Sequence, residues 1–148
     1  PSDWYDGKYN QLGSKSERKG FDIRLNAPIS DKSKIGISFV NTTDENGNSI
    51  SNIPKQIINV SLFSKITDKL SINGELKSVS DLTGVKSDGS GIVPLKDYNL
   101  LNGKVSYLLN ENSNIYLNGE NLLDETYETS SGYGTAKRSF YLGYETKF

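Results

Sequence analysis

The amino-acid sequence predicts an all-β protein, an antiparallel up-and-down meander of about seven strands. Three observations support this fold class: apolar and polar residues alternate with period two, no segment sustains a helical period, and the connections are alternately short and long. Side chains along a strand point in turn to opposite faces, so the alternation indicates strands with one apolar and one polar face.

The order of connections points to a particular kind of meander. The predicted strands cover residues 9–29, 33–43, 56–66, 70–80, 97–109, 113–123 and 137–148. Tight polar turns fill 30–32, 67–69 and 110–112, and longer segments rich in Gly, Ser, Asn and Asp fill 44–55, 81–96 and 124–136. Outer-membrane barrels have this asymmetry between short turns and long loops, whereas a Greek-key sandwich has no reason to keep it.

The last predicted strand alternates most clearly. One face carries Phe140, Leu142, Tyr144, Thr146 and Phe148, and the other carries Ser139, Tyr141, Gly143, Glu145 and Lys147. A strand that ends on an aromatic residue is expected at the end of an outer-membrane barrel. Taken alone, the segment fits an edge strand of a soluble sheet equally well.

The same phase in the four preceding strands leaves one face of the predicted sheet without a charge. The opposite face carries seven charged residues, Lys65, Glu75, Lys77, Lys104, Glu120, Glu145 and Lys147. A Lys or Arg at the bilayer midplane costs ~2–4 kcal/mol in such barrels, so an uncharged outer face is required there. A soluble β-sandwich also needs one uncharged face, so a glycan-binding sandwich module remains the alternative.

Composition narrows the functional classes. Hydrophobic residues make up 34% of the chain, as expected if one face of each strand lies in water. The net charge of −1 gives no reason to expect nucleic acid as a partner. Cys and His are absent, so we expect no thiol chemistry, no enzyme and no cofactor. A hydrolase using carboxylates such as Asp124, Glu125 or Glu128 is the weakest alternative.

Two motifs near the end of the chain carry a family resemblance. Residues 121–127 read Asn-Leu-Leu-Asp-Glu-Thr-Tyr, and residues 137–143 read Lys-Arg-Ser-Phe-Tyr-Leu-Gly. They resemble the C-terminal box of TonB-dependent outer-membrane receptors, in which Asn-Leu-Phe-Asp-Lys-x-Tyr precedes Gly-Arg-x-(aromatic)-x-(aliphatic)-Gly and a final Phe. The matching residues are Asn121, Leu122, Asp124, Tyr127, Arg138, Phe140, Leu142, Gly143 and Phe148. The departures are Leu123, Glu125 and Lys137.

Looser matches extend the resemblance over nearly the whole chain. They lie at Lys15–Ile23, at Ile53–Leu62 around Pro54, and at Asp97–Leu101. The resemblance implies a transmembrane barrel of about 22 strands that is plugged by an N-terminal domain. Residues 1–148 would then be the C-terminal portion of that barrel. The chain begins at Pro1 without a signal-peptide pattern, and we expect it to be an excerpt of a longer protein.

The resemblance also implies function, partners and location. Family members take up scarce nutrient chelates, such as cobalamin, ferric siderophores or haem, through the outer membrane of Gram-negative bacteria. Their partners are outer-membrane lipid, the plug and the remaining strands, the energy-coupling protein TonB and the β-barrel assembly machinery. That machinery would recognise Phe140, Leu142, Tyr144 and Phe148. Residues 127–129 and 132–135 look most like the cobalamin-receptor branch, although siderophore and haem receptors share much of the box.

Four further candidates each have a plainer alternative. The loop from Asp44 to Asn48 has oxygen ligands at alternate positions and could hold Ca²⁺, or it could be an ordinary hairpin loop. Loop 81–96 could contact ligand or be a solvated loop without a partner. The inward charges Glu75, Lys77, Lys104, Glu120 and Glu145 could pair across strands, face a plug, or simply be hydrated. The residues Trp4, Tyr5 and Tyr9 could form a ligand platform or pack within loops.

Overall fold

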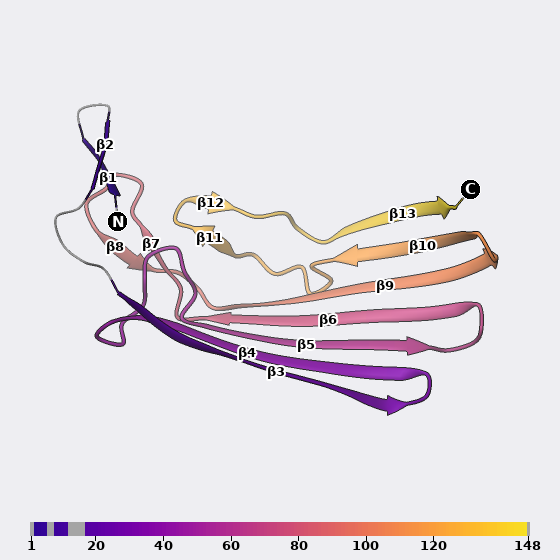
Figure 1. Ribbon diagram of the computed structural model, residues 1–148. Helices are drawn as coiled ribbons and strands as arrows, with labels where there is room; N and C mark the ends of the chain where they lie inside the picture. Colours follow the sequence, from indigo (N-terminus) through magenta and orange to yellow (C-terminus); the bar gives the residue numbers. More distant parts are fainter. Residues whose placement is uncertain (1, 6–7, 12–16, 148) are drawn as a thin grey trace.

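The structure is an all-β chain whose seven long strands confirm the predicted fold class (Figure 1). It is a computed structural model that describes residues 2–5, 8–11 and 17–147. The long strands are β3 (Arg18–Ser30), β4 (Ser33–Asp44), β5 (Gln56–Lys65), β6 (Leu70–Ser80), β9 (Tyr98–Asn110), β10 (Ser113–Glu120) and β13 (Ser139–Thr146). Within the described ranges, no helix is long and apolar enough to cross a membrane.

The boundaries differ from prediction at three places. The first predicted strand, 9–29, is not continuous, because residues 9–11 belong to β2 (Lys8–Gln11), which pairs with β1 (Ser2–Tyr5), and β3 begins only at Arg18. Strand β10 stops at Glu120, since Asn121 has a φ of 49° and turns the chain out of the sheet. The last strand runs from Ser139 to Thr146 and so begins two residues later than the predicted 137, while the predicted end at Phe148 lies outside the described residues.

The strands form one antiparallel sheet in the order β13-β10-β9-β6-β5-β4-β3. Long strands that follow one another along the chain are neighbours in the sheet, as a meander requires. The tight turns lie at one end, where the Thr67 hydroxyl accepts hydrogen bonds from the amides of Lys69 (3.2 Å) and Leu70 (3.0 Å). The three long connections lie at the opposite end, which we call the loop end (Figure 1).

Two of the long connections contain short hairpins. Strand β7 (Thr83–Val85) pairs with β8 (Ile92–Pro94), and β11 (Glu128–Ser130) pairs with β12 (Tyr133–Gly134). The described chain also has its buried hydrophobic residues here: Val79, Leu82 and Tyr98 are 1%, 2% and 4% exposed. The partly buried side chains packed around them are Ile57, Leu95, Leu100 and Tyr127. The core therefore lies at the loop end and not in the middle of the sheet.

The register places one apolar face across all seven strands. Its residues meet laterally in rows, and one row contains Leu25, Ile37, Val60, Leu76 and Leu101. Large side chains of this face are exposed: Phe21, Ile23, Leu25, Ile37, Ile58, Leu62, Ile66, Leu76, Val105, Tyr107, Leu109, Leu117, Phe140, Leu142 and Tyr144. On β9 the face extends from Leu101 to Leu109, roughly 27 Å along the strand. That length suits the apolar band of about 25 Å in outer-membrane barrels.

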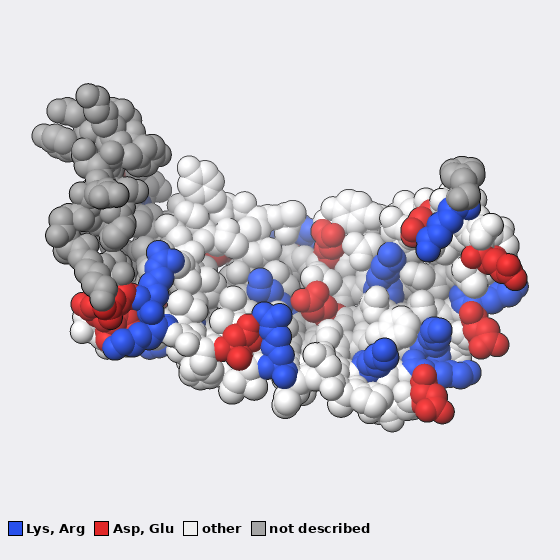
Figure 2. Space-filling model, in the orientation of Figure 1, with Lys and Arg blue, Asp and Glu red and all other residues white. Residues whose placement is uncertain are grey.

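The exposure of this face decides between the two sheet architectures that the sequence left open. In a soluble sandwich, a second sheet would cover the apolar face. Among the described strands, each long strand contacts only its neighbours in the same sheet, and no second sheet covers the outward side. The opposite, inward face carries the polar and charged positions. Figure 2 shows acidic and basic side chains interspersed over the face in view, without a patch of one sign.

Candidate functional site

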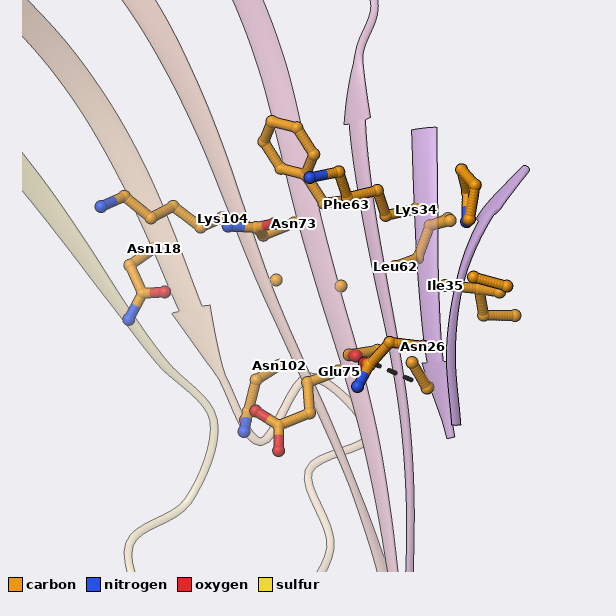
Figure 3. A pocket seen from close by; sticks show the side chains of 16 residues that line it. Asn26, Lys34, Ile35, Leu62, Phe63, Asn73, Glu75, Asn102, Lys104 and Asn118 are labelled. Carbon is orange, nitrogen blue, oxygen red and sulfur yellow. Dashed lines mark hydrogen bonds between the residues drawn. The ribbon is translucent and has the colours of Figure 1, made fainter. Parts of the chain in front are cut away.

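The inward face of the sheet contains a hollow of about 740 Å³. Two lateral rows of residues cross it. One runs through Gly36, Ser61 and Glu75, and the other lies two residues nearer the tight turns on each strand. Eight of its sixteen lining residues have side chains that can donate or accept hydrogen bonds: Asn26, Lys34, Ser61, Asn73, Glu75, Asn102, Lys104 and Asn118 (Figure 3). The hollow can therefore hydrogen-bond to whatever lies inside the barrel.

The predicted inward charges lie on this face but do not pair with one another. Lys104 places its Nζ 3.9 Å from the centroid of the Tyr116 ring, a cation–π contact. Glu120 accepts a hydrogen bond from Asn118 (3.2 Å) and Glu145 from Asn114 (3.3 Å). Ion pairs that link Glu75, Lys77, Lys104, Glu120 and Glu145 to one another are absent from the described part of the chain. Asn and Tyr neighbours take the place of the cross-strand ion pairs considered from the sequence.

Gly143 of the C-terminal box has a steric reason to be glycine. It lies opposite Tyr116 in the register of β10 and β13. A Cβ at this position would collide with the Cζ and hydroxyl oxygen of Tyr116, whose ring lies across the glycine backbone. Aromatic residues cover strand glycines in this way. Gly143 thus seats the ring that Lys104 contacts from the neighbouring strand.

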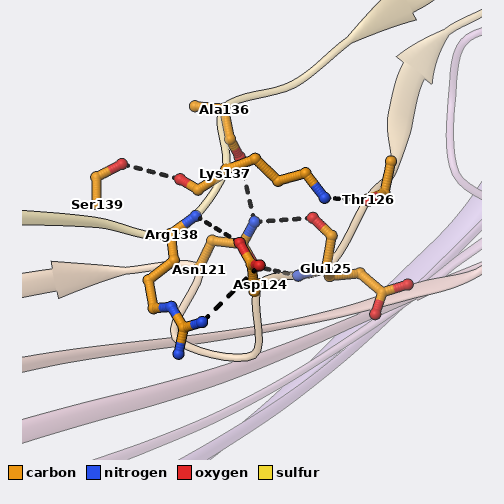
Figure 4. A network of polar contacts seen from close by, with 8 residues as sticks. All are labelled: Asn121, Asp124, Glu125, Thr126, Ala136, Lys137, Arg138 and Ser139. Atoms are coloured by element: carbon orange, nitrogen blue, oxygen red, sulfur yellow. Dashed lines mark hydrogen bonds and ion pairs between the residues drawn. The ribbon is translucent and has the colours of Figure 1, made fainter.

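Asn121 is the centre of a hydrogen-bond network at the end of β10 (Figure 4). Its side chain is buried, and its Nδ2 donates to the carbonyls of Glu125 (2.9 Å) and Ala136 (3.1 Å). Its Oδ1 accepts from the amide of Glu125 at 2.9 Å, and its own amide donates to Oδ1 of Asn102 at 3.0 Å. All three side-chain hydrogen bonds are satisfied by backbone, so Asn121 joins both ends of the loop between β10 and β13.

Asp124 joins the same loop to the start of the last strand. Its Oδ1 accepts from the amide of Arg138 at 3.2 Å, and its Oδ2 lies 3.8 Å from Nη2 of that arginine. Asp124 and Asn121 both have positive φ, 54° and 49°. Asn and Asp tolerate this left-handed conformation better than other non-glycine residues. The box therefore supplies both the backbone shape and the hydrogen-bond partners of one loop.

Leu122 folds back onto the outward face of the sheet. Its amide donates to the carbonyl of Leu101 at 2.8 Å. Its side chain lies over two glycines that are paired in register, so that a Cβ at Gly119 would be 2.6 Å and one at Gly103 3.4 Å from its methyl groups. The ring of Phe140 covers Gly119 from the other side, 3.2 Å from that Cβ position. Leu122 and Phe140 thus fill the space left by the missing side chains of Gly103 and Gly119.

Tyr127 completes the box on the inward side. Its ring packs on that of Tyr98, with centroids 4.2 Å apart, and its carbonyl accepts from the Thr135 hydroxyl at 2.8 Å. The structure thus brings Asn121, Asp124 and Arg138 into one network. The other box residues make separate contacts: Leu122 and Phe140 meet over Gly119, Tyr127 packs on Tyr98, and Gly143 lies beneath Tyr116. The sequence motifs gave no indication of Asn102 or Tyr116 as partners, because neither stands out from its neighbours along the strand.

Comparison with known proteins agrees with this architecture. No protein-family profile matches the sequence. The chain is 40% identical over 55 residues to the vitamin B12 transporter BtuB of Vibrio cholerae, a match that covers 36% of this chain and 9% of the transporter. The structure superposes on the siderophore receptor PiuA of Acinetobacter baumannii with a TM-score of 0.73 and 24% identity, covering 90% of this chain and 22% of the receptor.

Two other solved structures share the fold. FpvA of P. aeruginosa gives a TM-score of 0.76 at 18% identity, with 95% of this chain and 21% of that protein covered. The copper transporter OprC gives 0.73 at 12% identity, with 90% and 24% covered. The chain therefore has the fold of a segment of the β-barrel wall that these receptors and the copper transporter share. It spans less than a quarter of the length of these receptors.

Three of the four residues of the predicted assembly signal lie on the outward face of the sheet. Phe140, Leu142 and Tyr144 are 62%, 75% and 62% exposed on the outward face. The Tyr144 hydroxyl donates to the Ser113 hydroxyl at 3.2 Å, which holds the ring near the turn end. Phe148 lies outside the described residues. Recognition of these side chains by an assembly machinery stays a prediction.

The acidic loop from Asp44 to Asn48 is built as a hairpin turn. Oδ1 of Asp44 accepts hydrogen bonds from the amides of Asn46 (2.9 Å) and Asn48 (2.7 Å), and its Oδ2 accepts from the Asn48 side chain (3.2 Å). These bonds, that from the Asn48 amide above all, lower the pKa of Asp44. In the described part of the chain, no three acidic groups gather where a metal ion could be held. The plain hairpin explains this loop.

Loop 81–96 and the aromatic residues Trp4, Tyr5 and Tyr9 are the remaining candidates. Loop 81–96 is not solvated along its whole length. Leu82 is buried, and strand β7 of the hairpin β7–β8 packs on β11 in the neighbouring loop. Its tip is held by Asp88, whose Oδ1 accepts from the Ser90 amide at 2.9 Å and whose pKa is lowered mainly by that bond. Trp4 and Tyr9 are register partners in the β1–β2 pair. The side chains of Trp4, Tyr5 and Tyr9 lie outside the described part.

Proposed function

We propose that the receptor to which this segment belongs takes up a scarce nutrient chelate across the outer membrane of a Gram-negative bacterium. One observation carries the proposal: a single sheet has an exposed apolar face on one side and a hydrogen-bonding hollow on the other. Such a sheet is stable only where lipid covers the first face and water or protein covers the second. A soluble glycan-binding module would have to bury the apolar face.

The proposal assigns partners to each surface. Outer-membrane lipid covers the outward face, and the remaining strands of the same receptor pair with the open edges of β3 and β13. The plug domain of the receptor faces the inward hollow, where Asn, Lys and Glu side chains offer both donors and acceptors. The tight turns face the periplasm and the long connections face outward, as in other outer-membrane barrels. Energy would come from TonB through a part of the receptor outside this chain.

For the ligand, cobalamin is the first candidate. A local match of 40% identity over 55 residues is to a vitamin B12 transporter. Solved structures of similar fold include a siderophore receptor, so ferric siderophores are the second candidate. Haem, which rests on the motif resemblance alone, is the third.

We also propose that the segment has no enzymatic role, since its candidate carboxylates are engaged in holding loops. Asp124 binds the Arg138 amide, Glu125 forms a 2.6 Å ion pair with Lys96, and Glu128 accepts from the Gly132 amide at 3.0 Å. A general acid or base needs a proton-transfer position facing substrate. These groups instead face the backbone or a cation.

An uptake assay tests the function. A strain that lacks the full-length receptor, and the same strain complemented with it, would be given labelled cyanocobalamin, a ferric siderophore set and haem in parallel. We expect complemented cells to accumulate cobalamin, and the receptor to fractionate with the outer membrane. A receptor found in the cytosolic fraction would contradict the proposal, and uptake of a siderophore alone would correct the ligand. The matched control is a receptor without its TonB-contacting segment, which should reach the membrane and transport nothing.

A further inference from the structure

The three long connections are joined to one another, although the sequence suggests separate loops. Residues 44–55 reach residues 81–96 through a hydrogen bond from the Asn52 amide to the Thr83 carbonyl, 2.6 Å long. Ser51 and Thr83 form a parallel bridge beside it. The hydroxyls of both residues are buried, which places this junction inside the protein.

A second junction joins residues 81–96 to residues 121–136. The Lys96 ammonium forms a 2.6 Å ion pair with Glu125. Strand β7 packs on β11, where a Cβ at Gly84 would lie 3.1 Å from the Cβ of Ser131. The Asn121 network in turn ties this loop to the sheet. We call residues 44–55, 81–96 and 121–136 together the loop unit.

The loop unit is rooted on the inward face of the sheet. Leu82 comes from a loop and is 2% exposed, between Val79 of β6 and Tyr98 of β9, which are 1% and 4% exposed. Tyr127 adds its ring to the same cluster at 4.2 Å from that of Tyr98. Loops with few buried contacts open easily, whereas Leu82 anchors this loop in a cluster with the most buried hydrophobic side chains of the described residues.

Among the described residues, the glycines with positive φ lie at the tips of the loops: Gly47, Gly89, Gly91 and Gly132. No other atom lies within 4 Å of the position that a Cβ would occupy at the first three. The hinges that would allow a whole loop to swing are therefore not at its roots, where Leu82 and Asn121 are buried.

We propose that the loop unit is one rigid body that forms a fixed side of the receptor mouth, and that Leu82 is the positioning residue that holds it. The proposal rests on the proposed function in placing the loops outside the cell. The consequence is that any closure over ligand is carried by loops elsewhere in the receptor, against this side.

Amide hydrogen exchange of the intact receptor in detergent, followed by mass spectrometry without ligand, tests the coupling. In Leu82→Ala, the loss of a buried side chain should speed exchange at least about tenfold in 44–55, 81–96 and 121–136 together. The control is Ile92→Ala, on the same hairpin but 64% exposed, which should leave the other two loops unchanged. If Leu82→Ala accelerates 81–96 alone, the loops are independent and the proposal is overturned.

A milder variant covers the case in which Leu82→Ala does not reach the membrane. Leu82→Val keeps most of the buried volume and should give a smaller rise with the same three-loop pattern; a rise in one loop alone overturns the proposal equally. Exchange is read without ligand. Failure of the receptor to transport any tested chelate would therefore contradict the proposed function. The exchange measurement would still show whether the three loops are coupled.

Discussion

The loop end and the middle of the sheet are stabilised in different ways. At the loop end, Val79, Leu82 and Tyr98 form a small buried core, as in a water-soluble domain. In the middle, side chains such as Val105 and Leu117 are 45% and 47% exposed, and the backbone ladder is the main internal contact. The first region excludes water by itself, whereas the second would need the lipid of the proposed function to do so. One chain thus contains a domain-like end and a wall whose apolar face no other described residues cover.

The largest effect is expected from a charge placed on the outward face. Val105→Lys in the full receptor should destabilise the membrane-embedded fold by ~2–4 kcal/mol, because its ammonium would lie in hydrocarbon. Unfolding of the receptor from lipid vesicles in denaturant measures this. The control is Ser106→Lys, the next residue on the same strand, which faces inward and should cost far less. Equal losses for both variants would show that the two faces are not distinct.

Next in size is the loss of the Asn121 side chain at the loop end. Asn121→Ala leaves the amide of Glu125 and the carbonyls of Glu125 and Ala136 without partners, and should cost about 1–3 kcal/mol. Asn118→Ala, which removes one exposed hydrogen bond to Glu120, is the control. Denaturant unfolding with a probe in the loop between β10 and β13 follows the change. If both variants unfold alike, the network adds nothing to the loop end.

A smaller effect is expected at the Gly143–Tyr116 contact on the inward face. Gly143→Ala forces the ring of Tyr116 aside and should cost about 1–2 kcal/mol. Combined with Tyr116→Ala, the same substitution should be nearly neutral, because the clash is then absent. A double-mutant cycle on receptor stability measures this coupling. Additive losses would mean that the ring does not depend on the glycine.

The smallest effect concerns pH at the tip of loop 44–55. The hydrogen bonds to Asp44 lower its pKa below the ordinary value of about 3.8. Because the folded-state pKa is lowered, ionised Asp44 stabilises the turn at pH values above the ordinary pKa. This stabilisation is lost as the pH falls through the lower, folded-state pKa. Loop cleavage by an acid-stable protease should rise in that window. Asp44→Asn keeps an acceptor without titrating, so its cleavage should not change with pH.

Much of the fold could be predicted because a sheet with two different faces leaves a period-two pattern in every strand. The phase of Leu62, Leu76 and Val105 assigns the residues of their strands to one face and excludes registers shifted by one residue, since neighbours such as Leu76 and Leu101 must share a face. The end of β10 was predicted three residues too late. Leu122 and Leu123 continue the apolar pattern, and only the backbone turn at Asn121 stops the strand.

Contacts between distant residues could not be predicted in the same way. The box motif identified Asn121, Asp124 and Arg138 together, but their hydrogen bonds depend on where the loop returns to the sheet. Leu82 was not singled out, since one leucine in a polar loop carries no periodic pattern. The inward charges were placed on the correct face, while their partners depend on rotamers that the sequence does not encode locally.

The loop unit also bears on how this surface can change over evolution. A surface exposed to antibodies, phages and toxins gains from rapid sequence change, and loops are usually where it occurs. Here the roots of three loops pack on or are joined to a shared core, so substitutions there would disturb several loops at once. Residues 45–48 and 86–91 make few contacts with that core. They are the positions where we expect variation among strains, and where an inserted epitope tag should be tolerated.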